Sequence, residues 1–295
     1  FWFKTASKNK ESISFIAGGD SRNNQVPRQN ANKLVSKLKP TAVLFGGDMT
    51  GGDTDSEWQT WFNDWQYTIA SDNRMFPIIA TRGNHERDNR SIYNLFDTPS
   101  KSVYYSIPFG KHFVRIYTLN SEIAIPGSQT NWLKNELKAN KKDHWKIVQY
   151  HKPMRPHVSR KKEGHYNYQY WSSLFYAHNV QLVVESDSHT VKSTWPIKPS
   201  TGAGSDEGFI RDPKGTIYVG EGCWGAPLRK NDDSKKWTRD SGSFNQFKWI
   251  FVSKDAITTR TIKTDNVNEV AELTNENQFE IPKNLNIWSP PNGAV

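Results

Sequence analysis

The chain has 295 residues, long enough to bury a large two-layer core. No stretch approaches the ~20 consecutive apolar residues that a membrane-spanning helix needs, which excludes that class. The formal net charge is +9, from 39 Lys and Arg against 30 Asp and Glu. This excess fits either a solvated surface or an anionic ligand such as a phosphate ester. The basic residues are scattered, and the densest run, residues 160–162, is too short to indicate a nucleic-acid groove.

The cysteine count and the first residue are the features of the sequence that bear on cellular compartment. Cys223 is the single cysteine, so no internal disulfide can form and redox chemistry gives no signal. The sequence begins at Phe1 rather than Met, which a removed signal peptide or simple trimming would explain. We expect a secreted or periplasmic protein, with a cytoplasmic one left open.

Short apolar, β-branched runs alternate with helical patterns through the first two thirds of the chain. Strands are predicted at residues 13–17, 42–45, 76–80, 104–107, 113–119, 146–150 and 181–184. Helices are predicted at residues 27–38, 56–65, 129–139 and 170–178. Pro40 stops the first helix, and Ser56 is the expected cap of the second. The helical spacing of Trp58, Trp61 and Trp65 favours core packing over a ligand platform.

The last third changes to strands joined by loops, predicted at residues 217–219, 247–252 and 257–262. Residues 196–215 are rich in Gly, Pro and Ser and indicate a long loop, either over a site or as plain connection. Alternating β and α units followed by consecutive strands predict an α/β fold with mixed sheets. We expect a single domain over residues 1–265, with residues 266–295 as a tail that packs on its surface.

Polar side chains recur directly after five of the predicted strands. They are Asp20, Asp48, residues 84–86 (Asn-His-Glu), His151, and Asp187 with His189. Any one of these is more often a turn or cap residue than a ligand. Five at the same topological position favour a shared site, because ligands bind beyond the carboxyl ends of strands in open α/β sheets. Carboxylate and amide oxygens with imidazole nitrogens suit Zn, Mn, Fe or Mg.

These blocks, in this order and spacing, resemble the calcineurin-like metallophosphoesterases, with Gly83-Asn84-His85-Glu86 the most specific. Asp20-Ser21-Arg22 and residues 220–228 are similar to the bacterial branch that resembles purple acid phosphatases. The resemblance covers roughly residues 12–228. It implies a β-sandwich flanked by helices, with one or two divalent ions at a shared centre. A metal-bound hydroxide would then attack phosphorus in line.

The resemblance also implies a role for each matching residue. Asp48 would bridge both ions, Asp20 and His189 would hold one of them, and Asn84, His151 and Asp187 would hold the other. His85 would contact phosphate or protonate the leaving oxygen, with Glu86 as its orienting partner.

Three positions depart from the family pattern. Arg22 stands where the family often has a ligating His, and a guanidinium cannot ligate. It could pair with a substrate phosphate oxygen or with a neighbouring carboxylate. The first ion then keeps three protein ligands and would be weakly held or absent. Asp187 replaces a His and favours Mn, Mg or Fe over Zn at its ion. Gly51 stands where purple enzymes have a Tyr ligand, so no purple colour is expected.

Three further residues have two interpretations each. His157 and His165 follow His151 in a basic loop and would either contact substrate or remain loop histidines on a solvated surface. Trp224 lies in a glycine-rich segment near the expected site and would either pack in the core or stack on an aromatic leaving group.

These observations predict a metal-dependent hydrolase of small phosphate mono- or diesters, with monoesters slightly favoured. No membrane partner is expected, a nucleic acid partner is possible but not favoured, and the sequence does not give the oligomeric state. The alternatives are a degenerate binding protein of the same fold, in which Arg22 and Asp187 disable one metal position, and a nuclease of the same superfamily.

Overall fold

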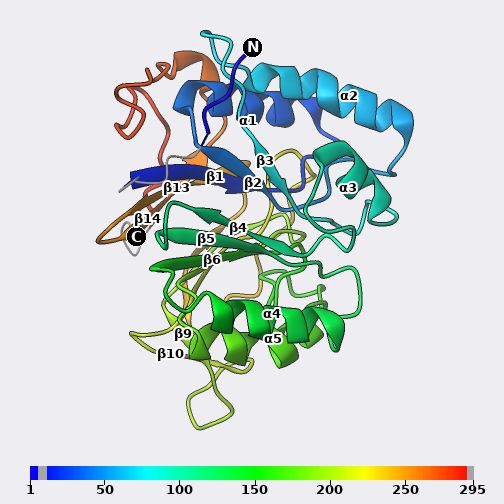
Figure 1. Cartoon of the computed structure of the whole chain (residues 1–295), viewed down its shortest axis with the longest axis vertical. Coiled ribbons are helices and arrows are strands. Elements are labelled where there is room, and N and C mark those ends of the chain that lie inside the picture. The colour runs from blue at the N-terminus through cyan, green and yellow to red at the C-terminus, as the bar shows by residue number, and fades with distance from the viewer. Residues whose placement is uncertain (6–11, 291–295) are drawn as a thin grey trace.

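Two β-sheets lie face to face between two layers of helices in the computed structural model, which describes residues 1–5 and 12–290 (Figure 1). The first sheet has five strands in the order β14-β13-β1-β2-β3. Their bounds are β1 (Ser12–Gly18), β2 (Ala42–Phe45), β3 (Ile78–Ala80), β13 (Gln246–Ser253) and β14 (Ile257–Lys263). β1, β2 and β3 run parallel, and β13 joins β1 antiparallel, so the sheet is mixed as predicted.

The second sheet has seven strands in the order β12-β8-β11-β7-β6-β5-β4. Their bounds are β4 (Tyr105–Phe109), β5 (Val114–Thr118), β6 (Trp145–Gln149), β7 (Leu182–Val184), β8 (Val191–Thr194), β11 (Ile217–Gly220) and β12 (Thr238–Gly242). β5, β6, β7 and β11 are parallel, while β4, β8 and β12 pair antiparallel. A separate hairpin of β9 (Ile197–Pro199) and β10 (Phe209–Arg211) occupies part of the segment predicted as a loop.

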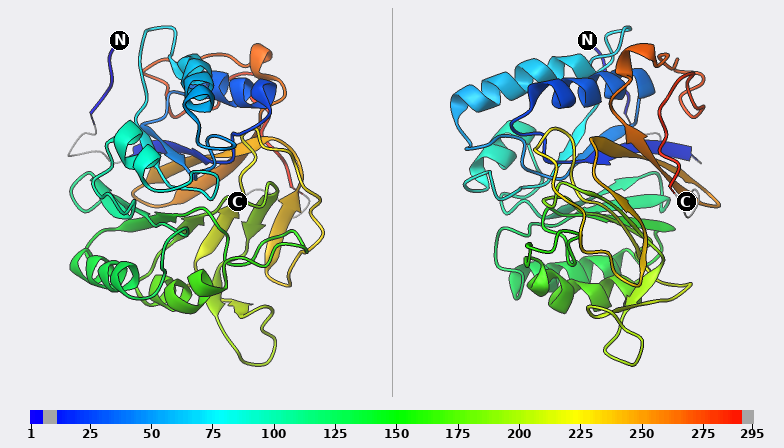
Figure 2. Two further views of the ribbon diagram at one scale, coloured as in Figure 1. Left: turned by 90° about the vertical axis from the view of Figure 1, so that its right-hand side faces the viewer. Right: turned by 180° about the vertical axis from the view of Figure 1, so that it is seen from behind.

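Helices cover the outer face of each sheet, which gives the expected αββα sandwich. α1 (Gln25–Leu38) and α2 (Asp55–Trp65) lie on the first sheet, and α4 (Ser128–Ala139) and α5 (His165–Ala177) lie on the second. Figure 2 shows the blue and green helical layers on opposite sides of the two sheets. α3 (Arg90–Phe96) and the short 3-10 helices Gln66–Thr68 and Val267–Glu269 complete the elements.

The two N-terminal helices begin and end at recognisable signals. α1 buries Ala31, Leu34 and Val35 and ends at Leu38. The C-cap residue Lys39 has a left-handed backbone (φ 46°) and precedes Pro40. The expected cap of α2 at Ser56 is wrong. Thr54 caps the helix two residues earlier, where its hydroxyl and the Glu57 carboxylate form a reciprocal capping box.

Aromatic rings fill the space between α2 and the first sheet. Trp61 is buried, its ring stacks on Trp65, and its indole N–H donates to Ser21 Oγ at 2.8 Å. Trp224 is also fully buried, and its indole N–H donates to Asn32 Oδ1 at 2.8 Å. The predicted packing role of the Trp stripe is confirmed, and Trp224 packs in the core.

The segment after β14 packs against α1 and β14, and Val267, Val270 and Leu273 are buried in the core. The backbone N–H of Leu273 donates to the Lys37 carbonyl at the end of α1, and that of Trp288 donates to the Thr261 carbonyl in β14. None of the helices in the described part of the chain combines the length and apolar character that a membrane crossing requires.

Candidate metal centre

The predicted site residues converge where the parallel strands of both sheets end. Asp20 follows β1, Asp48 follows β2 and Asn84 follows β3 in the first sheet. From the second sheet, His151 follows β6 and Asp187 follows β7. The sandwich thus brings donors from the strand-end loops of two sheets together.

Four of these residues have a left-handed backbone, which is uncommon outside glycine. The φ angles are 59° at Asp20, 54° at Asp48, 67° at Asp187 and 55° at His189. Such strain persists only where the surroundings enforce it, and it concentrates at functional sites. Gly222 makes room for this arrangement, because a Cβ atom there would overlap the Asp20 carboxylate.

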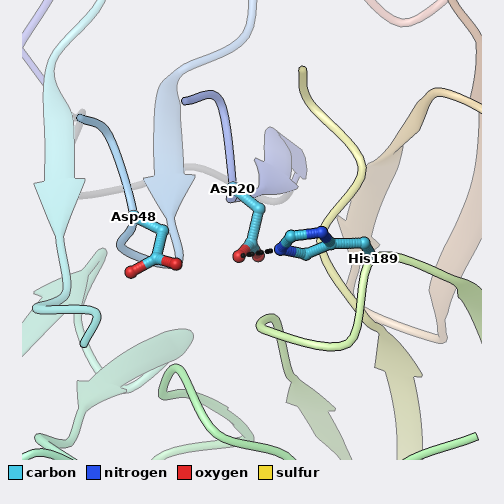
Figure 3. A group of neighbouring side chains, drawn as sticks. All are labelled: Asp20, Asp48 and His189. Carbon is cyan, nitrogen blue, oxygen red and sulfur yellow. Dashed lines mark hydrogen bonds and ion pairs between the residues drawn. The ribbon is translucent and has the colours of Figure 1, made fainter. Parts of the chain in front are cut away.

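The donors form two groups that share Asp48. Asp20, Asp48 and His189 form the first group, in which His189 Nε2 lies 3.1 Å from Asp20 Oδ1 (Figure 3). Asp48, His151 and Asp187 form the second. In that group, His151 Nε2 lies 3.3 Å from Asp48 Oδ1 and 3.7 Å from Asp187 Oδ1. Asn84 joins it, with Oδ1 3.2 Å from the same nitrogen.

Both histidines are held with Nε2 directed into the cluster. His151 Nδ1 lies 2.7 Å from the Gly46 carbonyl, and His189 Nδ1 lies 2.8 Å from the Pro227 carbonyl. A carbonyl can only accept, so each Nδ1 carries a proton and each Nε2 is the ring atom left to bind a metal ion or a second proton. These nitrogens face carboxylate oxygens at 3.1–3.3 Å, a contact that needs a proton or a metal ion between the two atoms. The donor set therefore fits divalent metal ions.

The carboxylates around His151 also favour a cation at the centre of the cluster. Burial would lower the pKa of His151, but the carboxylates of Asp48, Asp20 and Asp187 raise it to about 9. Burial would likewise raise the pKa of Asp48, yet His151, the backbone N–H of His85 and other neighbours hold it below its usual value. The cluster stabilises positive charge at its centre, whether a proton or a metal ion supplies it.

Three basic side chains contact the ligand residues. Arg22 Nε donates to Asp48 Oδ2 at 3.3 Å, so the alternative of a pair with a neighbouring carboxylate is present. Lys161 Nζ forms an ion pair with Asp187 Oδ2, and Arg229 donates to the Asp187 carbonyl. Sequence reasoning missed Lys161 and Arg229 as site residues. The basic run at 160–162 was a signal for Lys161, whereas nothing in the sequence marks Arg229.

His85 and Glu86 are arranged differently from the predicted pair. His85 Nδ1 donates to the Gly51 carbonyl at 2.6 Å, and its Nε2 lies 3.8 Å from Asp48 Oδ2. Glu86 instead accepts from the backbone N–H groups of Asp48, Met49 and Gly83. Glu86 as the orienting partner of His85 is therefore wrong; the Gly51 carbonyl has that position. Burial and Asp48 raise the pKa of Glu86 to about 7.

His157 and His165 lie outside both groups of donors. His157 is fully buried, with Nε2 2.7 Å from Thr238 Oγ1 and Nδ1 3.6 Å from Glu221 Oε1. It is neither an exposed loop histidine nor accessible to a substrate, because its buried ring packs against Thr238, Trp237 and Glu221. His165 is exposed at the start of α5 and lines a cavity of about 300 Å³ that also includes Lys161.

The calcineurin-like phosphoesterase profile matches residues 23–191, more than half of the chain. The chain belongs to the calcineurin-like phosphoesterase family. The family supports metal-dependent hydrolysis of phosphate esters as the general class of activity, and the Asp and His clusters could hold its metal ions. No curated protein sequence matches the chain.

Solved structures share this fold at low sequence identity. A purple acid phosphatase from yellow lupin seeds, PPD1, superposes with a TM-score of 0.75 at 15% identity, covering 90% of this chain and 54% of that chain. The chain thus spans about half the length of that phosphatase. GAP50, the anchor in the inner membrane complex of Plasmodium, superposes with a TM-score of 0.68 at 15% identity, covering 96% of this chain and 91% of that chain. PhoD superposes with a TM-score of 0.60 at 11% identity, covering 90% of this chain and 69% of that chain.

Proposed function

We propose that this member of the family hydrolyses phosphate monoesters in a metal-dependent reaction. The observation that carries the proposal is that Asp48 is shared by two groups of donors whose histidines both direct Nε2 inward. Asp20 and His189 would complete one position, and Asn84, His151 and Asp187 the other. One or two bound divalent ions would supply Lewis-acid charge at phosphorus and activate the attacking water.

The side chains around the donors would bind and orient the ester. Arg22 lies beside Asp48 and offers guanidinium N–H groups that suit two oxygens of a phosphoryl group. His85 faces the same carboxylate with Nε2 and is about 30% exposed, so it can be reached by the leaving group. In its protonated form, His85 would donate the Nε2 proton to the leaving oxygen, while the Gly51 carbonyl holds the ring.

Charge favours monoesters over diesters. Arg22, Lys161 and Arg229 all contact ligand residues of the cluster. A monoester carries up to two negative charges near neutral pH and a diester carries one, so fixed positive charge stabilises the bound monoester more.

The test is hydrolysis of nitrophenyl phosphate and bis(nitrophenyl) phosphate with added Mn²⁺, Mg²⁺ or Zn²⁺, against a chelator control. We expect turnover of the monoester with at least one metal, and a smaller kcat/KM for the diester. Absence of turnover with every metal would refute the proposal.

A degenerate binding protein of the same fold is the second candidate. The position of Arg22 against Asp48 and His189 favours it, because a guanidinium there opposes a metal ion. It predicts tight binding of phosphate esters with no turnover in the same assay. A nuclease predicts faster cleavage of polynucleotides than of small esters, with binding that weakens steeply in salt.

A further inference from the structure

The two metal positions differ in how completely they are built. Around His151 Nε2, three oxygens lie at 3.2 Å (Asn84), 3.3 Å (Asp48) and 3.7 Å (Asp187). Donors bound to one ion at about 2.0–2.2 Å are separated by about 3.0–3.5 Å along the edges of the coordination polyhedron. These four donors are thus close to the spacing that a single ion requires.

The other position contains a positively charged side chain. Arg22 Nε lies 3.3 Å from Asp48 Oδ2, and Arg22 Nη2 lies 3.5 Å from His189 Nε2. Asp48 and His189 are two of the three donors available there, with Asp20 the third. An ion bound to Asp48 Oδ2 and His189 Nε2 would have to displace the guanidinium from both.

The guanidinium is held in place from a third side. Arg22 Nη1 donates to Asn23 Oδ1 at 2.6 Å, and the Arg22 side chain is 13% exposed. Its backbone N–H also donates to the Asp48 carbonyl at 3.3 Å. A guanidinium keeps its charge at any working pH, so no change of protonation vacates the position.

The net charge of the cluster also disfavours a second divalent ion. Asp20, Asp48 and Asp187 carry three negative charges, while Arg22 and Lys161 pair with two of these carboxylates. One divalent ion already exceeds what remains to be neutralised. A second would add repulsion between like charges at a buried site.

We infer that this centre holds one divalent ion tightly, at Asp48, Asn84, His151 and Asp187, and that the Arg22 guanidinium takes the place of the second. The inference rests on the proposed function only in using the same centre. It makes the enzyme mononuclear, with an arginine that contributes fixed charge where relatives would use a metal.

The experiment counts ions. Full-length protein is loaded with Mn²⁺, separated from free metal and analysed by elemental analysis, calorimetric titration and electron paramagnetic resonance. Wild type should hold one Mn²⁺ with an isolated-ion spectrum. Arg22→His, which restores a ligand, should hold two with a spin-coupled spectrum, and its second ion should bind at least about tenfold more tightly than in wild type.

Two further variants make the result decisive. Arg22→Ala removes the guanidinium without adding a ligand and should also gain a second, weaker ion. Arg90→His makes the same substitution at an exposed arginine that pairs with Asp88, and it should stay at one ion. Two tight ions in wild type, or one ion in both Arg22 variants, would overturn the inference. Neither ion count depends on turnover, so both counts can be interpreted even if the protein does not hydrolyse phosphate esters.

Discussion

Asp48 links the two groups of donors, and its environment is built for an ionised carboxylate. The side chain is 1% exposed and accepts the backbone N–H of His85 at 2.9 Å through Oδ1. Oδ2 faces the Arg22 guanidinium. Converting this carboxylate to an amide keeps its size and removes the charge that Arg22, His151 and the His85 backbone N–H stabilise.

Asp48→Asn should therefore lower kcat/KM for nitrophenyl phosphate by at least about 100-fold while the far-ultraviolet circular dichroism spectrum stays unchanged. Asp88→Asn, at an exposed carboxylate paired with Arg90, serves as the control and should retain full activity. A fully active Asp48→Asn variant would remove Asp48 from the mechanism.

Lys248 on β13 gives a prediction for stability rather than activity. Its ammonium group is buried, and Nζ donates to Thr261 Oγ1 at 2.7 Å. Burial lowers the pKa of Lys248 to about 7, whereas the unfolded chain titrates near the ordinary value of 10.5. Between these values the unfolded state binds the extra proton, so this group makes the folded state more stable as pH rises.

The unfolding free energy of wild type minus that of Lys248→Met should thus increase by about 1.4 kcal/mol per pH unit between pH 7 and 9. Urea unfolding at a series of pH values measures it. The same difference for Lys254→Met, at an exposed lysine, should stay flat. A flat difference for Lys248→Met as well would show that the buried amine keeps its proton.

Helix α2 shows how one element supports the centre from behind. Its capping box at Thr54 and Glu57 starts the helix, and Trp61 then reaches Ser21 in the loop that carries Asp20. Glu57 also accepts the backbone N–H of Gly52, next to the His85-binding Gly51. The start of the helix and the ligand loops are therefore coupled.

Thr54→Ala should lower the unfolding free energy by about 1 kcal/mol, because a backbone N–H at the helix start loses its acceptor. Thr60→Ala in the same helix is the matched control. Thr60 is exposed and bonds only back to the Ser56 carbonyl among the interactions described, so its replacement should be close to neutral. A urea midpoint unchanged in Thr54→Ala would refute the capping role.

Loops from both sheets meet at the candidate metal centre, since Asp20, Asp48 and Asn84 follow strands of the first sheet and His151 and Asp187 follow strands of the second. An ion bound there joins loops from both halves of the core. Binding to the folded state alone must stabilise it, by about 2.7 kcal/mol when the free ion is 100-fold above its Kd.

Thermal unfolding should consequently shift to higher temperature with Mn²⁺ than with chelator, and the shift should be lost in Asp48→Asn. Calorimetric Mn²⁺ titration of the same samples establishes whether binding occurs. Binding without a shift in wild type would mean that the ion does not depend on the folded arrangement of the two sheets.

Local signals predicted much of this molecule. Apolar runs such as residues 42–45, bounded by Pro40 and Gly46, predicted strands that the structure confirms. The predictions failed where the local signal was weak. β12 has the polar sequence TRDSG and lies at the sheet edge beside β8, and α5 begins at His165 rather than at residue 170. The cap at Thr54 was missed because Ser56 fits the same rule.

The positions of most strands along the chain and the chemical types of the donors were readable from the sequence, because apolar runs and the residues that directly follow them are local properties. Tertiary structure alone decided which donors face one another: Asp20 and His189 are 169 residues apart and meet only because two sheets pack together. It also placed Arg22 against Asp48, enclosed His157, and turned Glu86 toward backbone N–H groups. These outcomes depend on side-chain direction across long-range contacts, which no local pattern encodes.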